Sequence, residues 1–272
     1  MRLPTDQKVY LVLVASASAG TFATFVTGIQ PGIIAPVLSA LIILVGNFAV
    51  FRAAASAIGK VHAVQGLGAV LTVGILSELL GLYTGFPFGT YRYNEAWAPV
   101  LPMPGNHFFP LMLPLAWTMV VGAASLSASR AAEPFSRRAW LISVLSVALL
   151  ATAVDFAMEP VMVDALGYWT WRGPTHGFSA PWQNAVGWFF VSAIGCLPLT
   201  ARLAGAKNKI ESGAGTLVLA GHLVVMSAVA ATHTHVGNSR MTLVGVAVLS
   251  YLWISQAMKG LLQRKKSEVP VG

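Results

Sequence analysis

Long apolar runs separated by short polar segments dominate the pattern of this sequence. About 20 apolar residues cross the hydrocarbon core of a bilayer as a helix, and eight runs approach that length. They lie near residues 9–29, 33–51, 61–82, 110–129, 139–163, 182–201, 213–231 and 241–258. The first run is longer than a signal-peptide core, so we expect it to be a retained helix. The pattern predicts an all-α, polytopic membrane helix bundle of about eight helices, as a single domain over residues 1–272.

The composition supports a membrane protein. The chain is 56% hydrophobic and only 10% charged, with a mean hydropathy of +0.71, whereas about a quarter of the residues in a soluble domain are charged. The net charge of +8 does not indicate nucleic-acid binding, because the basic residues lie between apolar runs and form no basic face or reading motif. The single cysteine, Cys196, rules out a disulfide framework and is interpreted as a core residue.

Basic residues alternate between the connections and predict the orientation. Fourteen Lys and Arg residues fall in the N-terminus, in the links at 52–60, 130–138 and 202–212, and in the C-terminal tail. The other connections hold three, namely Arg92, Arg172 and Arg240. Short loops rich in Lys and Arg stay in the cytoplasm, so both termini are expected there.

Three carboxylates interrupt the apolar runs and are the candidate catalytic residues: Glu78, Asp155 and Glu159. A charged side chain in a membrane helix costs about 2.5 to 3.5 kcal/mol on insertion scales, so it is a functional candidate by default. Asp155 and Glu159 are four residues apart and share one helix face, and Pro160 predicts a helix end or kink. With alternating helices, all three lie near the non-cytoplasmic surface. The structural alternative is a polar clasp between helices.

Two loops rich in aromatic residues cap the same predicted surface, after Leu82 and between Gly167 and Trp188. Most of their tryptophans fit an interfacial belt. The loop polar groups could instead complete a site around the acids, and Arg92 or Arg172 could pair with one of them. The candidate substrate-binding residues are Tyr91, Arg92, Trp169, Trp171, Trp182, Asn184 and Trp188, with Tyr93, Asn94 and Gln183 as further polar groups.

The sequence contains no motif for several other kinds of enzyme chemistry. The chain has no nucleophile elbow, phosphate-binding loop or dinucleotide fingerprint, and no cofactor is expected. His222, His233 and His235 lack the spacing of a zinc site, so we interpret His222 as a satisfied core residue and expect no metal. Two non-catalytic alternatives remain: a proton-coupled transporter, although no inverted repeat is visible, and a membrane scaffold that binds a ligand without converting it.

The combined motifs resemble a known family of membrane proteins. They are Glu78-x-x-Gly81 with Gly85-Phe-Pro-Phe-Gly89-Thr-Tyr91, Asp155-x-x-x-Glu159-Pro160, Trp169-x-Trp171, and Pro181-Trp-x-Asn184-x-x-Gly187-Trp188. From about residue 60 to 200 the chain resembles the integral-membrane carotenoid biosynthesis proteins of the carotenoid 1,2-hydratase kind, which act on gamma-carotene or bisanhydrobacterioruberin. The resemblance implies addition of water to the terminal C-1,2 double bond of a linear carotenoid end, giving a tertiary alcohol. With this ligand, the scaffold alternative is a non-catalytic carotenoid-binding membrane scaffold.

The three carboxylates suit such a reaction. Hydration needs a proton for C-2, a tertiary cation at C-1 and a water to trap it, and an apolar setting favours the protonated form of a carboxylic acid. Aromatic faces stabilise a cation. The expected partners are a linear carotenoid, membrane lipid and possibly other enzymes of the pathway, with no nucleic acid, at the cell membrane.

The charge asymmetry makes the orientation testable. Reporter fusions after Lys60, Arg138, Lys209 and the C-terminus should report cytoplasm, and fusions near Asn94 and Thr175 should report the opposite side. A cytoplasmic signal at Asn94 would overturn the assignment of the acids to the non-cytoplasmic surface.

Overall fold

Seven α-helices make up most of the described chain. The computed structural model describes residues 3–29, 32–129, 135–175, 179–208 and 210–232. The helices are α1 (Thr5–Thr27), α2 (Ile34–Ile58), α3 (Lys60–Thr84), α4 (Leu113–Ala128), α5 (Arg137–Pro160), α6 (Trp182–Ala204) and α7 (Ser212–Thr232). The predicted eighth span, 241–258, and the basic tail lie outside the described residues.

The outward surface of the bundle is apolar. Within the described part, six helices are long and apolar enough to cross a membrane, and α4 is shorter. Large apolar side chains such as Val12, Phe48, Leu76 and Leu149 point outward on different helices. A helix that is apolar on every side suits a lipid environment, so the chain is a multi-pass membrane helix bundle.

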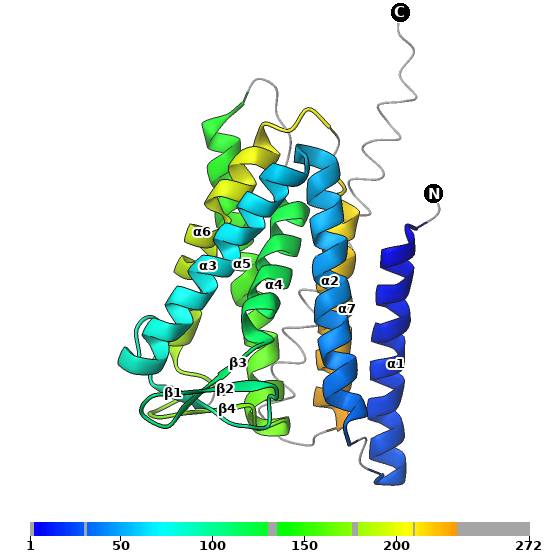
Figure 1. Cartoon of the computed structure of the whole chain (residues 1–272), viewed down its shortest axis with the longest axis vertical. Helices are drawn as coiled ribbons and strands as arrows, with labels where there is room; N and C mark the ends of the chain where they lie inside the picture. The colour runs from blue at the N-terminus through cyan, green and yellow to red at the C-terminus, as the bar shows by residue number, and fades with distance from the viewer. Residues whose placement is uncertain (1–2, 30–31, 130–134, 176–178, 209, 233–272) are drawn as a thin grey trace, which may run out of the picture.

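Helix α4 lies at the centre of the bundle (Figure 1). It packs against α2, α3, α5, α6 and α7, and nearly all of its residues are buried. Its run of Gly122, Ala123 and Ala124 presents little side-chain bulk, which lets neighbouring backbones approach closely. Successive helices run up and down, so the connections that contain strands all lie at one end of the bundle, opposite the N-terminal end of α1 (Figure 1).

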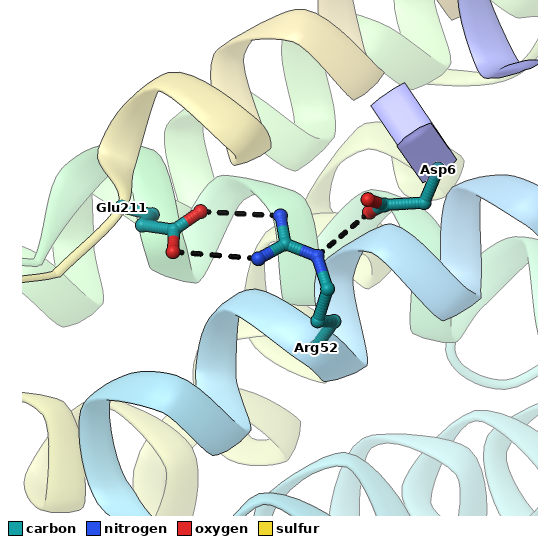
Figure 2. Close-up of polar contacts among 3 residues, drawn as sticks. All are labelled: Asp6, Arg52 and Glu211. Carbon is teal, nitrogen blue, oxygen red and sulfur yellow. Dashed lines mark hydrogen bonds and ion pairs between the residues drawn. The ribbon is translucent and has the colours of Figure 1, made fainter. Parts of the chain in front are cut away.

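The predicted polar link at 52–60 is wrong. Helix α2 continues to Ile58, and only Gly59 separates it from α3. Arg52 stays in the helix because it is paired: its Nε lies 2.9 Å from Asp6 Oδ2 and its Nη2 lies 3.1 Å from Glu211 Oε2 (Figure 2). The ion pairs join α1, α2 and the residue before α7. The predicted second span ended before Arg52 because that residue is charged, and the sequence alone did not reveal the ion pairs that keep Arg52 in the helix.

The all-α prediction also needs a correction, because two antiparallel strand pairs lie in the connections. In the loop between α3 and α4, β2 (Val100–Met103) pairs with β3 (His107–Pro110). More importantly, β1 (Tyr91–Tyr93) of that loop pairs with β4 (Trp169–Trp171) of the loop between α5 and α6. The second pair joins the two aromatic loops at the strand end of the bundle.

Pro160 ends the α-helical part of α5, as its position predicted. The chain continues as a π-helical turn, η1 (Val161–Ala165), in which Leu166 N–H donates to the Val161 carbonyl at 2.9 Å. Proline lacks an N–H and crowds the carbonyl four residues earlier, and such widened turns are frequent at functional sites. Glu159 itself remains helical and buried, so proline does not force it out of the helix.

Candidate functional site

The β1–β4 pair presents four aromatic side chains on one face. Its register places Tyr91 opposite Trp171 and Tyr93 opposite Trp169. Because alternate residues of a strand point to the same side, these four residues, here called the aromatic ladder, share a face, while Arg92 and Thr170 occupy the other. The aromatic ladder faces the carboxylates of α3 and α5.

Tyrosines of β1 and a tryptophan of α4 surround Glu78. Its Oε2 accepts hydrogen bonds from the Tyr91 hydroxyl at 2.6 Å and the Tyr93 hydroxyl at 2.9 Å, and its Oε1 accepts from Trp117 Nε1 at 2.9 Å. All four residues are buried. Burial, and then the nearby Glu78 carboxylate, raise the pKa of Tyr91 and Tyr93 well above the usual tyrosine value, so both phenols keep their protons and can donate.

Glu159 accepts hydrogen bonds from the other strand. Its Oε2 accepts from Trp169 Nε1 at 3.2 Å and from Trp171 Nε1 at 3.0 Å. Its Oε1 accepts from Asn184 Nδ2 at 2.9 Å. Each strand of the aromatic ladder therefore supplies donors to one glutamate: β1 to Glu78 and β4 to Glu159.

Asp155 has fewer partners than the two glutamates. Asn184 Nδ2 donates to its Oδ2 at 2.7 Å, so the same amide group bridges Asp155 and Glu159. Among the described residues, no N–H or hydroxyl group donates to Asp155 Oδ1, although only 1% of the residue is exposed. The Asp155 carboxyl group is also hydrogen-bonded to the carboxyl group of Glu159. A buried carboxyl oxygen without an N–H or hydroxyl donor is costly, which marks Asp155 Oδ1 as a candidate for contact with a substrate or water.

Two glycines of the sequence motifs allow these contacts. A Cβ on Gly81, one turn after Glu78, would lie 2.7 Å from the Tyr91 hydroxyl oxygen. A Cβ on Gly187 in α6 would lie 2.6 Å from a ring carbon of Phe88. Both distances are too short for a real side chain, so the spacings Glu78-x-x-Gly81 and Asn184-x-x-Gly187 have a steric reason.

The carboxylates line a cavity of about 540 Å³, here called the main cavity. Its polar end contains Glu78, Asp155, Glu159 and Asn184, together with the aromatic ladder, Trp117 and Trp188. The indoles of Trp117 and Trp188 stack with their ring centroids 3.8 Å apart. Away from the acids the cavity is mostly apolar and runs between α1, α2 and α7, past residues such as Leu38, Ile42 and Val225. It therefore suits an elongated apolar molecule with one reactive end.

The structure brings most of the predicted site residues together, but not all. Glu78, Asp155, Glu159, Tyr91, Trp169, Trp171, Asn184 and Trp188 line the main cavity. Arg92 points away and donates to the Asn106 carbonyl at 2.7 Å, because the strand alternation turns it from the acids. Trp182 is 55% exposed on the outer side of α6, edge-on to Phe156. Neither residue lines the main cavity, and their role in substrate binding stays a prediction.

The structure also differs from three further expectations, which concern the loop tryptophans, His222 and two polar loop residues. An interfacial belt does not describe Trp97, Trp169 and Trp188, because all three are buried. His222 is buried and lines the main cavity, but its Nε2 has no partner among the described residues, so it is not a satisfied core histidine. Asn94 and Gln183 bond to the carbonyls of Gly167 and Gly85 and hold the loops rather than the acids.

Trp117 is the site residue that sequence reasoning missed. It lies inside the predicted fourth span rather than at its end, and a tryptophan away from the interface was the available signal. The period-two pairs Tyr91-x-Tyr93 and Trp169-x-Trp171 were likewise a signal for strands. Within the described part of the chain, no group of three or more His, Cys, Asp or Glu side chains is arranged to hold a metal ion.

The fold and the site define a multi-pass membrane protein whose buried carboxylates and aromatic residues line an apolar cavity. The sequence model of the carotenoid biosynthesis protein family matches residues 38–253, so the chain belongs to this family. It is 34% identical over 125 residues to the bisanhydrobacterioruberin hydratase of Haloarcula japonica. That match covers 44% of this chain and 39% of the relative, so the chain spans well under two thirds of that protein. No solved structure matches the chain.

The close approach of the Tyr91 hydroxyl group to Gly81 can be tested by measuring the stability of a Gly81 variant. Gly81→Ala should displace the Tyr91 hydroxyl from Glu78 and cost about 1 to 3 kcal/mol, as overpacking typically does, which thermal unfolding in detergent would detect. Gly68→Ala is the matched control, because it lies on the same helix with open space around its Cα. Equal melting temperatures for the two variants would contradict the steric role of Gly81.

Proposed function

We propose that this protein is a carotenoid hydratase that adds water across the terminal C-1,2 double bond of a linear carotenoid and gives a tertiary 1-hydroxy group. The observation that carries the proposal is the buried Asp155 carboxyl group, which lies among other carboxylates at one end of an apolar cavity and whose Oδ1 accepts no hydrogen bond from any described N–H or hydroxyl group. Membership of the carotenoid biosynthesis family and the hydratase name of the Haloarcula relative support the substrate class and the reaction.

The hydrogen bonds suggest different roles for the three acids. Glu78 and Glu159 each accept three hydrogen bonds from neutral donors, and hydrogen bonds of this kind stabilise a carboxylate anion. Asp155 accepts one such bond, from Asn184, and its carboxyl group is also hydrogen-bonded to that of Glu159, which requires a proton on one of the two. Two neighbouring anions would repel the charged form of Asp155. We therefore assign the transferable proton to Asp155.

The proposed reaction begins with protonation of the alkene. The π electrons of the C-1,2 bond form a C–H bond at C-2 with the proton of Asp155, which leaves Asp155 as a carboxylate and a tertiary cation at C-1. The oxygen of a water molecule then attacks C-1, and its excess proton passes to Glu159 or directly back to Asp155. Proton transfer from Glu159 to Asp155 would restore the starting state, so each cycle consumes one water and no cofactor.

The surroundings of the acids suit a short-lived cation. The carboxylates of Glu78 and Glu159 supply negative charge, and the faces of Trp171 and Trp188 line the same end of the cavity. Aromatic faces attract cations by about 0.5 to 2 kcal/mol, more when desolvated. The polyene would extend from this end along the apolar walls of α1, α2 and α7. An apolar cavity also limits the number of water molecules near the cation.

The basic residues of the sequence lead us to propose that the acids face the non-cytoplasmic side of the cell membrane. Helix ends at the strand end of the bundle carry few Lys or Arg residues, whereas the connections at the other end are basic. A rod-shaped carotenoid of about bilayer length would then present its terminus near the interface.

The reaction can be tested with labelled water. Purified protein with a linear carotenoid should yield a product that is heavier by one water and keeps its visible spectrum, because the C-1,2 double bond is outside the conjugated polyene. In H₂¹⁸O the new hydroxyl should carry ¹⁸O, and in D₂O the product should gain deuterium at C-2. Oxygen derived from O₂, or no change in any linear carotenoid, would contradict the proposal.

The role of Asp155 can be tested with a pair of aspartate variants. General acid–base assistance is typically worth about 10² to 10⁴ in rate, so Asp155→Asn should lose turnover on that scale while still folding and retaining carotenoid. Asp164→Asn is the matched control, because Asp164 is exposed in η1 and bonds to Ser179 instead of lining the main cavity. Near-normal turnover in Asp155→Asn would remove Asp155 from the mechanism.

A further inference from the structure

A second, much smaller cavity lies behind the carboxylate pair. This niche has a volume of about 10 Å³, and its walls include Asp155, Glu159 and Asn184 from the site and Trp182 and Ala185 from the first turn of α6. Asp155, Glu159 and Asn184 also line the main cavity, whereas Trp182 and Ala185 do not. The three polar residues are therefore shared by the walls of the two cavities.

The niche has the size of a site for one water molecule, and three polar residues stand in a wall that is otherwise formed by Phe156, Ala180, Pro181, Trp182 and Ala185. About 10 to 15 Å³ is enough for one water molecule, provided that two to four polar partners are present. Here two carboxyl groups and an amide line the niche. One of those carboxyl groups belongs to Asp155, whose Oδ1 accepts no hydrogen bond from any N–H or hydroxyl group of the described residues. Such an atom can accept a hydrogen bond, and a water molecule in the niche would donate one.

The position of the niche connects it to the aqueous side of the protein. It lies at the strand end of the bundle, where α6 begins and the loop before it reaches the surface. Trp182, in its wall, is more than half exposed. Water could reach the niche from the interface without crossing the mostly apolar main cavity.

We propose that this niche binds the water molecule that is consumed in the reaction. The inference rests on the proposed hydratase function and adds a site for the second substrate. The carotenoid end reaches Asp155 and Glu159 from the main cavity, and water reaches the same carboxyl groups from the niche. Water oxygen attacks C-1 after protonation of C-2, its excess proton passes to Glu159 or Asp155, and the niche refills from the interface. Separate routes keep bulk water away from the polyene.

The test fills the niche from a wall that the main cavity does not share. Ala185→Leu should remove the space for water and lower turnover at least tenfold, while the amount of carotenoid retained by the purified protein stays at the wild-type value. The matched control is Ala201→Leu, at a similarly half-buried position of α6 that lines neither cavity. In the double variant Ala185→Leu with Trp182→Ala, the lost indole reopens the niche, and turnover should recover.

Two measurements keep the result separate from a general disturbance of the fold. Retained carotenoid reports an intact main cavity, and an experimental density map that resolves ordered water should show a peak in the wild-type niche but none in Ala185→Leu. Full turnover in Ala185→Leu, no recovery in the double variant, or an empty wild-type niche would each overturn the water site. If the wild-type protein hydrates no linear carotenoid, the hydratase proposal fails, and the map still decides whether the niche binds water.

Discussion

Three carboxyl groups buried in an apolar bundle need hydrogen-bond donors, and the arrangement of the loops follows from that need. A buried polar group without partners costs about 1 to 3 kcal/mol, and more when it is charged. In the described structure the donors to the acids are neutral: two phenols, three indoles and one amide. Pairing β1 with β4 brings four of them to one face. The short strands thus connect two distant loops to the acids of α3 and α5.

The same network makes the acids chemically different. Each glutamate accepts hydrogen bonds from three neutral donors, whereas among the described residues Asp155 accepts one, from the amide that it shares with Glu159. The carboxyl groups of Asp155 and Glu159 are also hydrogen-bonded to each other. A site made only of neutral donors holds its carboxyl groups without neutralising them by salt bridges. By contrast, the partly buried guanidinium group of Arg52, at the opposite end of the bundle, forms ion pairs with Asp6 and Glu211. Charge pairing there joins helices, while the donor network at the acids leaves one group available for proton transfer.

Local chemistry accounts for the parts of the site that the sequence predicted. Carboxylates in apolar runs are conspicuous because they are expensive in a membrane, so Glu78, Asp155 and Glu159 could be identified without a structure. Arg92 and Trp182 were predicted from local features as well, because a polar or aromatic side chain in the two aromatic loops could face the acids. Their directions depend on strand pairing and on the orientation of α6, and both turn away from the main cavity. Trp117 was missed because the predicted span around it, residues 110–129, contains no charged residue that would mark a site.

The sequence by itself determined the membrane helices, the three acids and the aromatic loops, because hydrophobic length and unpaired charge are local properties of the chain. Tertiary structure alone decided which donor meets which acid. The bonds from Tyr93 and Trp117 to Glu78 and from Asn184 to Asp155 join residues that are 15, 39 and 29 positions apart. Tertiary structure also decided that, within the described chain, Asp155 accepts only one hydrogen bond from a neutral donor and that a water-sized niche lies beside it, since both depend on how α5, α6 and the paired strands pack together.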